Sequence, residues 1–358
     1  MKRDEEIKAL LTFIQETHAP VIQYDEKRIQ SDFQKNDNKL SFPLKLLSII
    51  GGYLATSLFV GFIVAFQILY QSDIALMVFG GFFILASIWI LRLSNIIFLE
   101  TVCVCTFLIG CVMLGYGYIN AELGVNQVSI LFLLIAIASI IISKHYILSF
   151  LGLLIIYGSI LTLILYNELF IGILIYTSVI GLILYFYLTN EAKIIKRFKI
   201  FTYIYNPIRT GLILSFVSNL AILCLRGMLD IPVDYVWISS LINISLITIF
   251  LLKIYKTLQV TEMKSKIFLS IFSLLILLPT VTFPGISGAI LIILLCFFVK
   301  YKTGFVLGVL AFLYFVSQFY YDLNLTLLNK SILLFLSGIL FLTLYYFTNK
   351  TLAKHEKI

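Results

Sequence analysis

The hydrophobic pattern of this chain consists of long apolar runs separated by short polar turns, and it does not alternate from residue to residue. A helix needs about 20 apolar residues to cross roughly 30 Å of hydrocarbon, whereas strands of a membrane barrel alternate apolar and polar positions. The pattern therefore predicts about twelve membrane helices. We expect them at 43–70, 73–93, 97–118, 126–143, 146–166, 168–188, 206–226, 235–252, 266–282, 285–299, 303–321 and 331–348.

Composition supports an all-α, polytopic transmembrane helical bundle. The chain has 358 residues, of which 61% are hydrophobic and 12% are charged, and its mean hydropathy is +1.05. Its five cysteines lie inside apolar runs without a C-x-x-C pair, and its three histidines lie in the N- and C-terminal segments or at a helix end. We therefore expect no metal site, no cofactor and no catalytic residues, and the prediction is that the protein is not an enzyme.

The distribution of Lys and Arg predicts the orientation in the membrane. If the N-terminus is cytoplasmic, only Arg226 and Lys330 of the 26 Lys and Arg residues fall on the opposite side. Cytoplasmic loops retain the basic residues, so we expect both termini in the cytoplasm. The net charge of +8 is explained by basic loops beside anionic lipid headgroups, and no nucleic-acid partner is needed.

A weak internal repeat suggests two halves of six helices in the same orientation. "PLKLL" at 43–47 and "PIRTGL" at 207–212 open the two groups, which close with "GLILYFYLTN" at 181–190 and "GILFLTLYYFTN" at 338–349. Parallel repeats are found in many secondary transporters, although proline, basic and aromatic residues also mark ordinary membrane boundaries. The predicted division is an N-terminal segment 1–42, a first half 43–190, a basic linker 191–205, a second half 206–349 and a tail 350–358.

The N-terminal segment has apolar residues at helical spacing, at Ile7, Leu10, Leu11 and Ile14. This spacing predicts a short amphipathic helix that lies on membrane lipids or docks onto another membrane protein. The alternative is a solvated lead-in to the first membrane helix.

Two pairs of polar residues fall within the membrane helices. Arg92 and Glu100 flank a tight turn, and we interpret them as an intramembrane ion pair, with a proton or substrate site as the alternative. Asn219 and Asn243 fall at similar depth on consecutive antiparallel helices. An amide pair there would either tie the helices together or line a ligand path.

The region 266–300 is interrupted by prolines and glycines and has two short arms. It forms either two short spanning helices with a tight turn or a re-entrant loop. Irregular backbone at membrane depth must be buried in protein or line a wet cavity, so a binding site competes here with a plain turn. The candidate residues of this helix break are Pro279, Thr282, Pro284, Gly285, Ser287 and Gly288.

Three segments of the chain resemble domain of unknown function 4401, a bacterial family of polytopic membrane proteins. They are "LLSIIGGYLATSLFVGF" at 46–62, "FPGISGAILIILL" at 283–295 and "SQFYYDLNLTLLNKSILLFLSGILFL" at 317–342. The resemblance implies a protein of the bacterial cytoplasmic (inner) membrane and supplies no function. The break is also similar to the P-G-x-S-G-G element of polyprenyl-phosphate translocases, except that Ala289 replaces the last glycine and no second copy is present.

These observations leave two main functional hypotheses. The first is a permease-like or lipid-handling carrier whose path is lined by the break and by Asn219 and Asn243. The second is a non-catalytic subunit or sensor of a membrane complex, which would dock through the N-terminal helix. An enzyme acting on lipids is a distant third.

Overall fold

The computed structural model describes residues 42–65, 72–93, 96–143, 145–197, 201–224, 235–257 and 263–322, with isolated positions between 328 and 342. Every element in these ranges is a helix, which confirms the all-α prediction. The elements are α3 (Phe42–Ala65), α4 (Asp73–Leu93), α5 (Ile97–Asn120), α6 (Val125–Ser143), α7 (Tyr146–Tyr166), α8 (Phe170–Thr189), α9 (Glu191–Arg197), α10 (Phe201–Cys224), α11 (Val236–Thr257), α12 (Met263–Leu277), η2 (Leu278–Thr282), α13 (Pro284–Phe298) and α14 (Lys302–Asp322).

Eight of the described helices are long and apolar enough to cross a membrane, namely α4 to α8, α10, α11 and α14. The protein is thus a multi-pass membrane protein. The helices α12 and α13 have 15 residues each and reach only about 22 Å, less than the hydrocarbon thickness. The predicted N-terminal helix and most of the predicted last helix, 331–348, lie outside the described residues.

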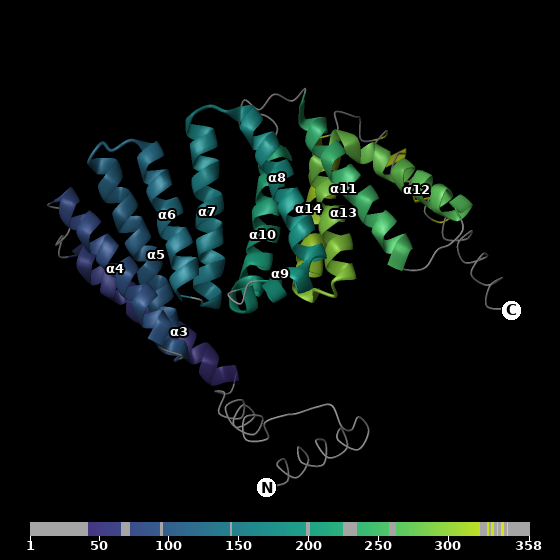
Figure 1. Ribbon diagram of the computed structural model, residues 1–358. Coiled ribbons are helices and arrows are strands. Elements are labelled where there is room, and N and C mark those ends of the chain that lie inside the picture. The colour runs from purple at the N-terminus through teal and green to yellow at the C-terminus, as the bar shows by residue number, and fades with distance from the viewer. Residues whose placement is uncertain are drawn as a thin grey trace, which may run out of the picture.

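The helices stand side by side in a curved row (Figure 1) and form two packed groups. In the first, α4 packs on α5 and α6 packs on α7, around a core that includes Ile84 and Phe107. In the second, α8, α10, α11, α13 and α14 share one larger core. The helix α7 packs on α10 and joins the groups, while α8 packs mainly with the second-half helices.

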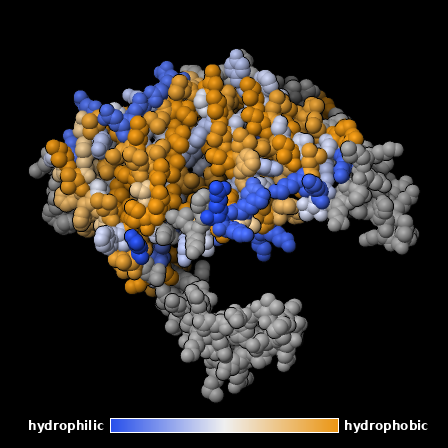
Figure 2. Space-filling view, viewed as in Figure 1, coloured by the Kyte–Doolittle hydropathy of each residue, from blue (hydrophilic) through white to orange (hydrophobic). Residues whose placement is uncertain are grey.

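The surface agrees with a membrane environment. Figure 2 shows a broad hydrophobic area over the helices and hydrophilic patches near their ends, including one over α9. The α9 end of the second group is held together by contacts between segments that are far apart in the sequence. Lys253 donates to the Thr189 carbonyl over 3.3 Å, and the Arg209 guanidinium lies 3.6 Å from the centre of the Tyr301 ring.

A buried polar layer as the candidate functional site

Four helices of the second group, α8, α10, α11 and α13, carry seven buried polar side chains, which we call the polar layer. Each of its members is at most 3% exposed. Polar groups at membrane depth are costly and rare, so a concentration of them marks a candidate functional site. The members are Thr177, Ser215, Asn219, Ser239, Ser240, Asn243 and Ser287.

Helical spacing places members of the polar layer on shared helix faces. Ser215 and Asn219 are four residues apart on α10, and Ser239 and Asn243 are four apart on α11, so each pair lies on one helix face. The start of α8, the end of α10 and the start of α11 meet in one apolar cluster, which places these three helix ends at one level. Asn243 lies roughly 10 Å inside that level, because seven residues of helix precede it in α11.

The two asparagines each bond to a further helix. The Asn219 amide donates to Thr177 Oγ1 of α8 over 2.7 Å, and the Tyr157 hydroxyl donates to Asn219 Oδ1 over 3.5 Å. The Asn243 amide donates to Ser287 Oγ of α13 over 3.4 Å. The helix α8 packs on both α10 and α11, and a Cβ on Gly181 would lie 3.1 Å from Phe216 and 3.5 Å from Asn243 Oδ1. Each amide therefore links its helix to α8 or α13 instead of pairing with the other.

Several oxygens of the polar layer have no partner among the described residues. Most serine and threonine hydroxyls among the described residues donate to a carbonyl one turn earlier, as Ser178 does to Leu174 over 2.9 Å. By contrast, Ser215 Oγ, Ser239 Oγ, Ser240 Oγ and Asn243 Oδ1 are buried and make no hydrogen bond. An unsatisfied buried polar group costs about 1–3 kcal/mol. The polar layer therefore contains oxygens that the hydrogen bonds between its helices do not use.

The break between α12 and α13 delivers Ser287 to this layer. After η2, Phe283 is extended, with φ −138° and ψ 92°, and α13 begins at Pro284, whose ring fixes a helical φ and whose missing N–H is not needed in the first turn. Ser287 also donates to the Pro284 carbonyl over 3.1 Å. The start of α13 is thus the part of the break that lies at the polar layer.

The predicted break residues divide into two sets. Pro279 and Thr282 are exposed in the turn, whereas Pro284, Gly285, Ser287 and Gly288 are buried. A Cβ on Gly285 would lie 2.5 Å from Phe315 of α14, and one on Gly288 would overlap Leu220 of α10. These two glycines therefore allow α13 to approach α14 and α10 closely.

The charged pair predicted in the first half has a different arrangement. The Glu100 carboxylate lies 3.6 Å from His145 Nε2 at the start of α7. Arg92 is exposed in the last turn of α4 and lines a groove toward α6. Glu100 therefore lies against the neighbouring hairpin, and the described residues show no ion pair between it and Arg92.

Comparison with known proteins gives the family. A family model described as Domain of unknown function (DUF4401) matches residues 42–351. The chain belongs to this family. No curated protein and no solved structure matches this DUF4401 chain. These comparisons give no support to the likeness to polyprenyl-phosphate translocases.

Four of the seven members of the polar layer of this DUF4401 protein were missed from the sequence. Thr177, Ser215, Ser239 and Ser240 look like ordinary small residues of membrane helices, which usually bond to their own backbone. A signal was present on α11, where "SSLIN" at 239–243 places two serines on the face of an asparagine. The position of Thr177 depends on how α8 packs against α10, α11 and α13, and no local sequence pattern encodes this packing.

Proposed function

We propose that this protein is a permease-like carrier for a small, uncharged polar solute and that the polar layer is the place where the solute binds. The observation that carries the proposal is the set of four unpartnered oxygens, Ser215 Oγ, Ser239 Oγ, Ser240 Oγ and Asn243 Oδ1. A purely structural role does not account for these oxygens, because they form no hydrogen bond between helices and cost free energy to bury.

The chemistry of the layer favours an uncharged solute. All seven members of the layer are hydroxyl or amide residues. Hydroxyl groups donate and accept hydrogen bonds, and an amide oxygen accepts them. These groups match the hydroxyls or amides of a small solute, and none of them supplies a charge that would neutralise an ion.

The helix break supports a route to the layer. Binding sites of secondary transporters are commonly built at interrupted helices near the membrane centre. Here the interruption at Leu278–Phe283 separates α12 from α13, and the bond from Asn243 to Ser287 is 3.4 Å long, near the weak end of the hydrogen-bond range. A small movement of α13 would break this bond and open the closed layer between α11 and α13.

Solute uptake by proteoliposomes tests the proposal. The purified chain is reconstituted at equal density as wild type and as Asn243→Leu, and the entry of glycerol, erythritol or urea is followed by light scattering. We expect the wild-type chain to accelerate the entry of at least one solute and the variant to lose this acceleration. Equal rates in wild-type, variant and protein-free vesicles for every solute would contradict a carrier of this class.

A further inference from the structure

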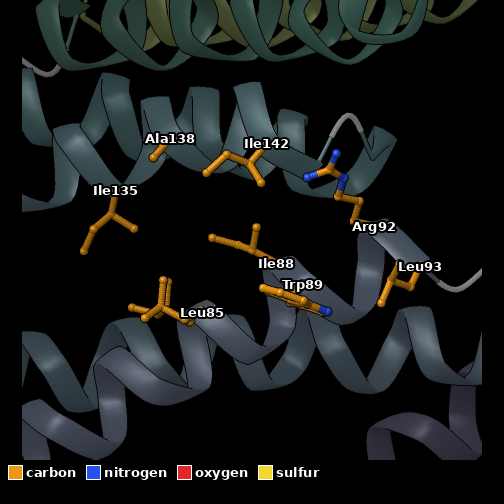
Figure 3. Close-up of a pocket in the computed structure, with 9 residues that line it drawn as sticks. Leu85, Ile88, Trp89, Arg92, Leu93, Ile135, Ala138 and Ile142 are labelled. Atoms are coloured by element: carbon orange, nitrogen blue, oxygen red, sulfur yellow. The ribbon is translucent and has the colours of Figure 1, made fainter.

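The first group of helices contains a groove that is separate from the polar layer. It lies between α4 and α6 and has a volume of about 690 Å³. In Figure 3, Ile135, Ala138 and Ile142 of one helix face Leu85, Ile88 and Trp89 of the other, and Arg92 lies toward one end. The groove exists because α4 packs chiefly on α5 and α6 chiefly on α7, so the two hairpins meet less closely.

The groove has an apolar body and one cationic end. Its walls are aliphatic apart from Trp89 and Arg92, which are three residues apart on the same face of α4. From Ile84 to Arg92 the helix rises about 12 Å, which runs from the middle of α4 to its last turn. Trp and Arg at the end of a membrane helix lie at headgroup level, where indole and guanidinium groups meet lipid polar groups.

The charge of Arg92 is available to a ligand. Glu100, the carboxylate nearest in sequence, points instead to α7, where its carboxylate lies 3.6 Å from His145 Nε2. Within the described ranges no acidic side chain forms an ion pair with Arg92, whose side chain is exposed. A guanidinium in this position binds a phosphate oxygen pair well, because its planar N–H groups match the phosphate geometry.

We propose that this groove binds one anionic phospholipid, with an acyl chain along Ile84 to Trp89 and the phosphate at Arg92. The occupant follows from charge complementarity. The apolar body of the groove matches an acyl chain, and the cation at its headgroup-level end matches the phosphate of an anionic lipid. The site lies in the first group of helices, so it does not depend on the proposed carrier function.

Tryptophan fluorescence offers a direct test, because Trp89 lines the groove and the only other tryptophan is Trp237 of α11. The full chain with Trp237→Phe is reconstituted into phosphatidylcholine vesicles that contain a small fraction of brominated phosphatidylglycerol, and bromine in the acyl chains quenches Trp89 on contact. A second set of vesicles carries the same fraction of brominated phosphatidylcholine in unlabelled phosphatidylcholine, and quenching of Trp89 is compared between the two sets. The matched control is Trp89→Phe, which reports on Trp237, itself 46% exposed.

We expect phosphatidylglycerol to be enriched at Trp89 about fivefold over its bulk fraction, the effect of one basic residue at an anionic interface. Enrichment should fall to the bulk fraction in Arg92→Gln and should persist in Lys256→Gln, which removes an exposed cation elsewhere. Equal quenching of Trp89 by both lipids, or an enrichment that survives Arg92→Gln, would overturn the proposal. Equal enrichment at Trp237 would overturn it too, since binding would then not be specific to the groove.

Discussion

The amide of Asn243 on α11 donates a hydrogen bond to the hydroxyl of Ser287 on α13, over 3.4 Å and in a region with no solvent exposure. This bond joins a spanning helix to the first turn of a helix that begins at a proline within the membrane part of the chain. It connects the two candidate sites that the sequence suggested separately, the asparagine level and the proline–glycine break.

Removal of the Asn219 amide should weaken the second group of helices. Asn219→Ala loses the 2.7 Å bond to Thr177 and the acceptor for Tyr157. Interhelical hydrogen bonds in membranes contribute about 0.6 to 2 kcal/mol, so we expect the free energy of unfolding to fall by about 1 kcal/mol. Unfolding in mixed micelles measures it.

The control for this variant is Ser245→Ala on α11. Ser245 is exposed and bonds only to the carbonyl of Leu241 in its own helix. Its removal should leave stability unchanged. If Asn219→Ala were no less stable than Ser245→Ala, the bond to Thr177 would contribute nothing to helix association.

Two adjacent glycines of α4 should respond in opposite ways to alanine. A Cβ on Gly80 would lie 2.8 Å from the Leu114 amide nitrogen and 2.9 Å from the Gly110 carbonyl oxygen, and both are rigid backbone atoms of α5. We expect Gly80→Ala to destabilise the protein by about 1–3 kcal/mol, the usual cost of overpacking. Thermal unfolding in detergent measures the difference.

Gly81 is the matched control, because a Cβ there meets nothing within 4 Å. Gly81→Ala should be neutral or slightly stabilising, since alanine favours the helix by about 1 kcal/mol. Similar melting temperatures for the two variants would show that α4 and α5 are not in close contact at this point.

The tyrosines at the α9 end of the second group form a reciprocal pair. Tyr187 donates to the Tyr205 carbonyl and Tyr205 donates to the Tyr187 carbonyl, each over 3.1 Å, and their rings stack with centroids 4.6 Å apart. Tyr205→Phe keeps the stacking and removes the bond to the Tyr187 carbonyl, so we expect a loss of about 1 kcal/mol in unfolding free energy. Tyr203→Phe, at a position that is 66% exposed, should change nothing, and an equal effect of both variants would contradict the pair.

The bounds of several helices could be predicted because the length of each apolar run determines where a membrane helix begins and ends. The structure gives α4 and α7 the predicted bounds, 73–93 and 146–166, since polar turns delimit both runs sharply. The start of α10 was predicted at 206, yet the helix begins at Phe201 with Pro207 inside it. Proline lacks the N–H that would bond to the carbonyl four residues earlier, and its ring crowds that carbonyl, so a helix is expected to begin near a proline. Here the turn before Pro207 is helical despite this lost bond. The 6+6 repeat and the cytoplasmic location of the termini remain predictions.

The candidate site was predicted in part, for a physical reason. Asparagine and a proline break are unusual in a membrane helix and can be recognised one at a time, as Asn219, Asn243 and Pro284 were. Partners are set by helix packing, so Thr177 and Ser287 as the amide acceptors, and His145 as the neighbour of Glu100, follow only from the arrangement of α7, α8 and α13.

Water access to Ser287 tests the central claim most directly. In a chain whose five native cysteines are replaced, Ser287→Cys is treated with hydroxyethyl methanethiosulfonate in membrane vesicles, and Ala289→Cys, two residues along α13 and equally buried in the apolar core, is the control. A polar layer that opens to admit a solute predicts that Ser287→Cys reacts several-fold faster than Ala289→Cys. If both thiols stay equally unreactive until the protein is unfolded, the layer joins helices and carries nothing.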